Sequence, residues 1–261
     1  MKKTFLLSYL MLAAMPVMAA YTGHVYVDKN KNGVFDQSEK PLAGIKVSDG
    51  LNVVETAADG SFTLPGHERE RFIFITTPSG YKTFNRHYHK IEKKQSGYDF
   101  GLIPYSGRIR KDGSHRYIHI TDTEIFNTEN HADWVNNVHD YARNEQAAFI
   151  IHTGDICYEK GLKAHIKLMN TENMDCPVFY CIGNHDLVKG KYGEELFESI
   201  YGPVYYSFDA GNVHYVVTPM PGGDHAPGYT SDDVCRWLKN DLAHIRPGTP
   251  VVVFNHDLLT Y

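Results

Sequence analysis

Cysteine is scarce in this chain: its 261 residues include four, Cys157, Cys176, Cys181 and Cys235. So few cysteines in a chain of this size do not make a disulfide framework, which excludes the small disulfide-stabilised class of secreted domain. Cys176 and Cys181 lie on a stretch expected to be extended, so their Cα atoms are predicted to be ~16 Å apart. Because a disulfide needs Cα atoms within ~7 Å, these two do not pair with each other. We expect buried thiols.

A strong charge of either sign is also missing. The formal net charge is −5 and charged residues make up 22% of the chain, which is no electrostatic footprint for nucleic acid. No nucleic-acid partner is therefore indicated. The chain has no Gly-x-Ser-x-Gly segment and no glycine-rich Walker loop, which excludes the two hydrolase classes built on them. A small phosphate-ester substrate is compatible with this composition.

Long apolar runs are absent after the N-terminus, so no transmembrane segment is expected in the mature chain. The N-terminus begins with two lysines, followed by an apolar run over residues 5–20 that ends in small residues. This order predicts a secretory signal peptide, residues 1–19, cleaved after Ala19. The alternative is a membrane-spanning helix, but the run is shorter than the ~20 residues needed and contains Pro16. We therefore expect an exported protein, periplasmic or extracellular.

Residues 20–105 show β-strand patterns alone. Residues 21–27 and 44–47 alternate along the chain, residues 72–76 are rich in β-branched and aromatic side chains, and turns with glycine and proline separate the strands. Short strands at this spacing predict a small all-β sandwich domain.

Residues 106–261 change to an alternation of strands and helices. Residues 205–210 and 213–218 flank Gly211-Asn212, which is a hairpin signal. The alternation predicts an α/β fold with a largely parallel sheet covered on both faces. Helices are predicted at 132–145, 159–172, 192–201 and 232–245, and further strands at 117–121, 148–152, 177–182 and 250–255.

Polar side chains able to bind a metal follow four of these strands. A single aspartate after a strand is usually a helix cap or a turn residue. Four such groups in succession point to a site, because ligands bind where the carboxyl ends of the strands meet, and two groups carry a glycine that allows close backbone approach. The groups are Asp122-Thr123-Glu124, Gly154-Asp155, Gly183-Asn184-His185-Asp186 and Asn255-His256.

This set of groups suits phosphate-ester hydrolysis. The reaction must stabilise charge on the phosphoryl oxygens and produce a nucleophile from water, and two cations ~3.5–4 Å apart do both. A bridging carboxylate holds cations that close, and mixed oxygen and nitrogen ligands favour Mn, Fe, Zn or Ni. Two divalent or trivalent transition metals are therefore predicted.

In order and spacing, the four groups resemble the signature blocks of the calcineurin-like metallophosphoesterases over residues 116–261. Gly-Asp followed ~30 residues later by Gly-Asn-His-Asp is the most specific part of the resemblance. It implies a metallophosphoesterase-type layered β-sheet and helix domain, and the preceding β-domain resembles the N-terminal module of secreted bacterial members.

The resemblance also implies roles for single residues. Asp155 would bridge the two metals and Asp122 would bind the first. Asn184 and His256 would bind the second. His185 would protonate the leaving oxygen or stabilise the transition state rather than bind metal.

Two features depart from the family pattern. The first block usually reads Asp-x-His, and here Glu124 takes the third position, which keeps a ligand and favours harder ions. The family's last block, Gly-His-x-His, supplies one ligand to each metal and is missing. The only His-x-His, His87-Tyr88-His89, lies in the β-domain and is interpreted as surface. We therefore expect a phosphoesterase domain that is incomplete at its C-terminus and a chain that is weakly active alone.

Two other functions stay open. One is a calcium-stabilised surface or binding protein whose phosphoesterase domain is catalytically incomplete, which the missing block favours and the intact Asp155 and Asn184-His185 oppose. The other is a phosphate or nucleotide binder without turnover.

A second motif lies in the β-domain, where residues 28–39 match the calcium-loop pattern position for position. The alternative is a polar turn between strands, and no helices flank the loop as in an EF-hand. Two neutral asparagine ligands predict weak affinity, in the extracellular range. The predicted oxygen ligands are Asp28, Asn30, Asn32, the Val34 carbonyl, Asp36 and Glu39.

Three further positions lie near the site motifs. His119 and His152 precede ligand groups on strands and are predicted to pack behind the site. Asp224, in a loop rich in proline and glycine, is a further candidate to approach it.

Overall fold

The structure, a computed structural model, describes residues 20–95, 97–106, 108–125 and 131–257. The predicted signal peptide, residues 1–19, lies outside these ranges. Within the described ranges, the structure has no helix with the length and apolarity that a membrane span requires.

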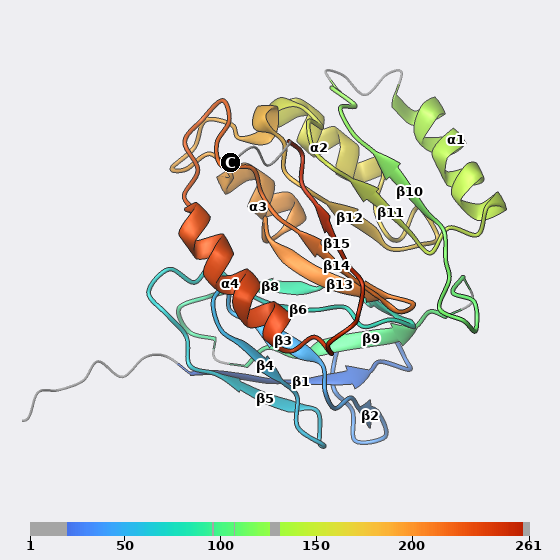
Figure 1. Ribbon diagram of the computed structural model, residues 1–261, viewed down its shortest axis with the longest axis vertical. Helices are drawn as coiled ribbons and strands as arrows, with labels where there is room; N and C mark the ends of the chain where they lie inside the picture. The colour runs from blue at the N-terminus through green and yellow to red at the C-terminus, as the bar shows by residue number, and fades with distance from the viewer. Residues whose placement is uncertain (1–19, 96, 107, 126–130, 258–261) are drawn as a thin grey trace, which may run out of the picture.

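The N-terminal part folds into two sheets (Figure 1). One has the order β2 (Lys40–Pro41), β1 (Tyr21–Val27), β9 (Phe100–Pro104) and β7 (Tyr81–Thr83), with β5 (Ser61–Leu64) also paired to β1. The other has the order β4 (Val53–Glu55), β3 (Lys46–Ser48), β6 (Phe72–Ile75) and β8 (Tyr88–Lys90). Side chains from both sheets form one core, so the predicted sandwich is confirmed.

Strand β6 shows how the sandwich attaches to the rest of the molecule. All four of its residues are buried, because successive side chains of a strand point to opposite faces and both faces are covered here. Ile73 and Ile75 belong to the sandwich core. Phe72 and Phe74 belong to a second core that includes Trp237 of the C-terminal part. The sandwich is thus packed against the remainder by a full sheet face.

The C-terminal part contains two three-stranded sheets. In the first, β10 (Tyr117–Ile120), β11 (Phe149–His152) and β12 (Val178–Tyr180) are parallel. In the second, β13 (Tyr206–Ala210) pairs antiparallel with β14 (Val213–Val217), which pairs parallel with β15 (Val251–Phe254). The predicted hairpin is confirmed. The prediction of a single, largely parallel sheet was wrong: the chain reverses at the tight turn at Gly211, and the hairpin becomes part of a separate sheet.

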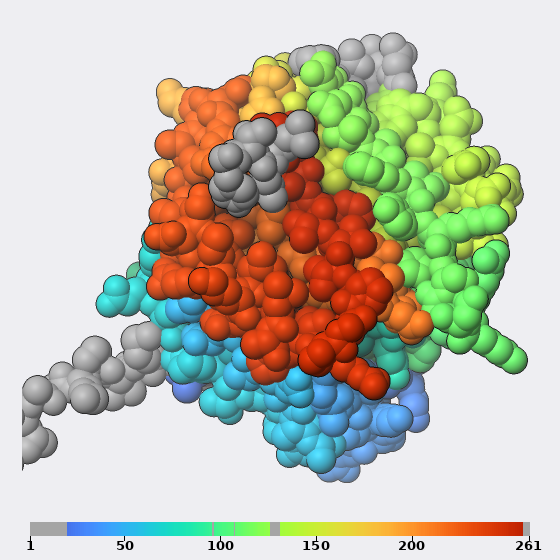
Figure 2. All heavy atoms as spheres, in the orientation of Figure 1, coloured from blue at the N-terminus to red at the C-terminus, as the bar shows by residue number. Residues whose placement is uncertain are grey.

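Helices and sheets stack in layers, as Figure 1 shows. One face of the first sheet packs under α1 (His131–Asn144), α2 (Tyr158–Leu168) and α3 (Glu195–Tyr201), and its other face packs on the second sheet. Helix α4 (Ser231–Ala243) packs across the junction of the second sheet and the sandwich, and Figure 2 shows α4 and β15 on one exposed face. The predicted layered α/β domain preceded by a β-domain is confirmed, and the four predicted helices form.

Two smaller expectations need correction. The thiols of Cys157, Cys176 and Cys181 are buried as expected, but Cys235 is exposed, because it lies on the outward face of α4 beside buried Val234. His87 is not a surface residue: it packs on Tyr206 with ring centroids 4.5 Å apart, and burial lowers its pKa to about 3.

Candidate metal centre

The loops that follow β10 and β11 run side by side. The N–H of Asp122 donates to the Gly154 carbonyl and the N–H of Glu124 donates to the Asp155 carbonyl, each at 3.0 Å. Asp122, Glu124 and Asp155 have positive φ angles of 53°, 43° and 53°. Non-glycine residues rarely adopt this conformation, and its cost is tolerated mostly at functional sites. The backbone here is strained to present these three carboxylates.

A third loop, after β12, approaches so closely that it needs glycine. A Cβ atom on Gly183 would lie 2.2 Å from the backbone nitrogen of Asp155 and 2.2 Å from its Oδ1. A Cβ atom on Gly154 would lie 2.5 Å from the Gly183 nitrogen. The close approach allows the N–H of His185, in the short 3-10 helix η1 (Asn184–Asp186), to donate to Asp155 Oδ1 at 3.0 Å.

The fourth strand, β15, delivers His256 to the same place. Its Nδ1 is 2.9 Å from the Thr153 carbonyl, which only accepts hydrogen bonds, so Nδ1 carries a proton and a neutral ring presents its lone pair at Nε2. This Nε2 is 3.2 Å from Asn184 Oδ1 and 3.4 Å from Asp155 Oδ2. When the ring is neutral, three lone-pair donors converge here. That arrangement suits a cation.

The site residues predicted from the sequence are brought together in two groups that share one member. The ligand atoms of Asp122, Asp155 and His256 lie within 4.8 Å of one another, as do those of Glu124, Asp155 and His185. Asp155 is 4% exposed and common to both groups. This grouping differs from the assignment that the family resemblance implied. That assignment placed Asp122 and His256 on different metals, and it did not make His185 a metal ligand.

His185 has a second carboxylate on its other side. Its Nδ1 is 2.9 Å from Asp224 Oδ2, and its Nε2 is 4.0 Å from Asp155 Oδ2. The hydrogen bond to Asp224 raises the pKa of His185, which burial alone would lower. The sequence marked Asp224 only by its place in a loop near the site. The structure makes it the partner of His185.

The donor set fits transition metals. Carboxylate, imidazole and amide groups gather at one sheet edge, and the described residues place no lysine or arginine in an ion pair with Asp122, Glu124, Asp155 or Asp224. Clustered carboxylates without a lysine or arginine beside them repel one another, and a bound cation reduces that repulsion. Mixed oxygen and nitrogen ligands suit Mn, Fe, Zn or Ni.

Comparison with known families agrees with this geometry. A family model described as calcineurin-like phosphoesterase matches residues 115–260, more than half of the chain. The chain belongs to this family. A model of the N-terminal domain of calcineurin-like phosphoesterases matches residues 29–104, and a search of curated proteins finds no match. Family membership implies metal-dependent hydrolysis of phosphate esters at a dinuclear metal centre.

Two histidines of this calcineurin-like phosphoesterase contact the ligand loops; His152 packs behind them as predicted, whereas His119 is exposed and reaches them only by a hydrogen bond. His152 is fully buried and its Nε2 is 2.9 Å from Thr123 Oγ1, between Asp122 and Glu124. Burial lowers the pKa of His152 to about 3, so the ring is neutral at physiological pH. His119 Nε2 is 2.8 Å from Thr153 Oγ1. Both histidines thus contact threonine side chains of the ligand loops.

The loop of residues 28–39 lies at the edge of the sandwich. The N–H of Gly33 donates to Asp28 at 2.9 Å and the N–H of Lys29 donates to Glu39 at 2.8 Å. Asp28 is 1% exposed and Glu39 is 6% exposed. Within the described part of the chain, neither carboxylate has an ion pair with lysine or arginine. The remaining predicted ligands lie in the same turn, where Asn30 and Asn32 donate to Asp36 and the N–H of Val34 donates to Asn32.

Proposed function

We propose that this protein is an exported phosphoesterase that hydrolyses small phosphate mono- or diesters with two transition metals bridged by Asp155. The observation that carries the proposal is the buried Asp155 carboxylate shared by two groups of metal-binding side chains. The proposed division of the chain is a signal peptide over residues 1–19, a β-sandwich over 20–105 and the phosphoesterase domain over 106–261.

The proposed metal ligands are Asp122 and Glu124 for one ion and Asn184 and His256 for the other. Asp122 is also within reach of His256, so its carboxylate fits either ion. When bound, the metals supply charge for the phosphoryl oxygens and a water of lowered pKa. Glu124, in place of the family's histidine, favours a harder ion such as Mn.

His185 is the proposed proton donor to the leaving oxygen. Its Nδ1 is held by Asp224, so its Nε2 is the nitrogen that faces the site. Because Asp224 raises the pKa of His185, the ring keeps its proton closer to neutral pH, which suits a general acid. Asp224 orients this ring and need not touch the substrate.

A calcium ion is proposed in the loop of residues 28–39. The buried carboxylates Asp28 and Glu39 support it, because backbone N–H groups are their neighbours instead of a lysine or arginine, and a cation would offset the cost of burying them. The ion would stabilise the sandwich rather than take part in hydrolysis.

Turnover of p-nitrophenyl phosphate and bis(p-nitrophenyl) phosphate, with Mn supplied, tests the proposed function. Wild-type protein is expected to hydrolyse at least one of them, and Asp155→Asn neither, because it loses the bridging carboxylate. Failure of the wild type with Mn, Fe, Zn and Ni would contradict hydrolysis by this chain and favour the binding protein.

Export is tested by N-terminal sequencing of secreted protein, which is expected to begin at Ala20 or Tyr21.

A further inference from the structure

The loop of residues 219–230 joins the metal centre to the β-sandwich. At its middle, Asp224 contacts His185. Gly228, four residues further along, lies at the border with the sandwich. Its carbonyl accepts a hydrogen bond from Arg69 Nη2 at 2.9 Å, and its N–H donates to Glu194 Oε1 at 3.0 Å and Oε2 at 2.9 Å.

Glu194 is itself held by the sandwich. It is fully buried on entry to α3, and Arg71, directly before β6, binds its Oε1 at 2.8 Å and Glu198 Oε1 at 2.7 Å. A Cβ atom on Gly228 would lie 3.0 Å from Glu194 Oε1 and 3.1 Å from Arg71 Nη1, so the fit is tight. The Gly228 carbonyl therefore binds Arg69 directly, and the Gly228 N–H is connected to Arg71 through Glu194. Both arginines belong to the β-domain.

The site end of the loop is fixed by backbone contacts. The N–H of Asp224 donates to the Asn184 carbonyl at 3.1 Å, and the N–H of Gly193 donates to the Ala226 carbonyl at 2.8 Å. A Cβ atom on Gly223 would lie 2.8 Å from the Asn184 carbonyl oxygen. The segment between Asp224 and Gly228 is therefore short and held by contacts at both ends.

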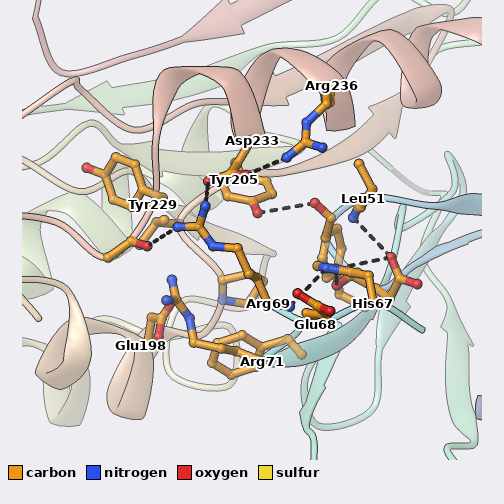
Figure 3. A pocket seen from close by; sticks show the side chains of 17 residues that line it. Leu51, His67, Glu68, Arg69, Arg71, Glu198, Tyr205, Tyr229, Asp233 and Arg236 are labelled. Carbon is orange, nitrogen blue, oxygen red and sulfur yellow. Dashed lines mark hydrogen bonds and ion pairs between the residues drawn. The ribbon is translucent and has the colours of Figure 1, made fainter. Parts of the chain in front are cut away.

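Arg69 has a close counterpart that does not touch the loop. Both Arg69 and Arg236 bind Asp233, at 2.9 Å and 2.8 Å, and their side chains are 54% and 58% exposed. Both line a cavity of about 440 Å³ between the sandwich and the phosphoesterase domain. Figure 3 shows Arg69 between Asp233 and a carbonyl beside Tyr229, with Arg236 reaching Asp233 from α4. Arg236 is therefore a matched control for Arg69: it has the same charge, a similar exposure and the same aspartate partner, but no contact with Gly228.

We propose that Arg69 and Arg71 of the β-domain are positioning residues for phosphoester hydrolysis. They hold the Gly228 peptide, and the loop in turn holds Asp224 against His185 Nδ1. The sandwich thereby forms part of the catalytic apparatus. This inference rests on the proposed function, in which His185 donates the proton.

The kinetic test measures bis(p-nitrophenyl) phosphate turnover with Mn in the full chain. Arg69→Ala is expected to lower kcat ~3–10-fold with KM changed less than ~2-fold, because it misplaces a transition-state group. In an Asp224→Asn background the same change is expected to cost less than ~1.5-fold, because the contact that it supports is already weakened. Arg236→Ala is expected to stay within ~2-fold in both backgrounds. An equal loss from Arg69→Ala in both backgrounds, or equal effects of the two arginines, overturns the inference.

Arg71 is tested with a variant that keeps its charge. Removal of the guanidinium would leave Glu194 and Glu198 buried without a cationic partner and endanger folding. Arg71→Lys retains one charged donor and loses the paired contact. It is expected to lower kcat in the same direction as Arg69→Ala, again with little further loss in the Asp224→Asn background. Unchanged kcat in Arg71→Lys removes Arg71 from the proposal.

Hydrogen exchange at the amides of residues 223–228 separates failure of this inference from failure of the proposed function. Faster exchange in Arg69→Ala but not in Arg236→Ala supports the inference about the loop. If the wild type then hydrolyses no phosphoester, the proposed function is what fails. Equal exchange in the two variants overturns the inference whatever the activity.

Discussion

At the residue scale, the chemistry depends on how His185 is held. One ring nitrogen is bound by Asp224 and the other faces Asp155 at 4.0 Å. His185→Gln is expected to slow turnover by ~10²–10⁴, the usual effect of losing a general acid, and to leave bound metal unchanged. Turnover and elemental analysis of the purified variant check this. Loss of metal from His185→Gln would instead make His185 a ligand, as its grouping with Glu124 and Asp155 allows.

That the site residues lie close together could largely be predicted from the sequence. Asp122, Asp155, Asn184 and His256 each follow an apolar strand, and strands of an α/β fold end at one edge. The hydrogen bond between Asp224 and His185 could not be predicted in the same way. These residues are 39 positions apart, and the loop that carries Asp224, residues 219–230, has no periodic pattern to fix its path.

At the scale of elements, the metal centre depends on two loops that touch through Gly183. A Cβ atom there would meet the Asp155 backbone nitrogen at 2.2 Å, so Gly183→Ala must push the loops apart. It is expected to lose most bound Mn and turnover. Gly222→Ala is the matched control, because a Cβ atom there meets nothing within 4 Å and the backbone needs no positive φ. Equal Mn content in the two variants would show that the close approach does not matter.

The loop of residues 28–39 gives a second prediction at this scale. Millimolar calcium is expected to raise the Tm of the full chain by mass action, because the ion binds the folded loop and not the unfolded one. Glu39→Gln is expected to remove most of that shift, while Glu92→Gln, at an exposed position of the same domain, is expected to keep it. Scanning calorimetry with and without calcium measures both. No shift in the wild type would make the loop a plain polar turn.

Elements were easier to predict than their pairing. The amphipathic helices and apolar strands follow from periodicity, which reports which side chains share a face. Periodicity does not say which strands pair. The hairpin of β13 and β14 was predicted from its turn residues, but the separate sheet that these strands form with β15 was not predicted. Similarly, the β-branched and aromatic side chains of residues 72–76 predicted a strand, but not that one face of β6 packs against α4.

At the scale of the whole molecule, a buried charge network crosses from the sandwich to the phosphoesterase domain. Lys46 binds Asp209 at 3.3 Å, and His214 lies between Asp209 at 2.6 Å and Asp241 at 2.8 Å. Burial alone would lower the pKa of His214, but its hydrogen bonds to the two aspartates raise it to about 8. The protonated ring therefore stabilises the folded state.

This network predicts how stability depends on pH. A pKa raised from 6.5 to about 8 contributes stability that is fully present below pH 6.5 and is lost as pH rises through 8. The loss amounts to about 2 kcal/mol of unfolding free energy. Urea unfolding between pH 6 and pH 9 is expected to show this slope in the wild type and not in His214→Gln.

His139 supplies the control for that measurement. It too lies between two aspartates, Asp140 at 3.2 Å and Asp175 at 3.1 Å, but on the surface, where solvent screens such pairs. His139→Gln is expected to keep the slope of the wild type. If His214→Gln and His139→Gln give the same slope, the buried network does not set the pH dependence.

The central claim is that two metals held around Asp155 carry out phosphoester hydrolysis, and a metal titration tests it most directly. Protein stripped with a chelator is titrated with Mn while bis(p-nitrophenyl) phosphate turnover and bound metal are followed together. We predict no turnover in the stripped protein, a plateau at about two Mn per chain for a dinuclear centre, and neither binding nor turnover in Asp155→Asn. Turnover that persists without metal, or an Asp155→Asn protein that matches the wild type in bound Mn and rate, would contradict the account.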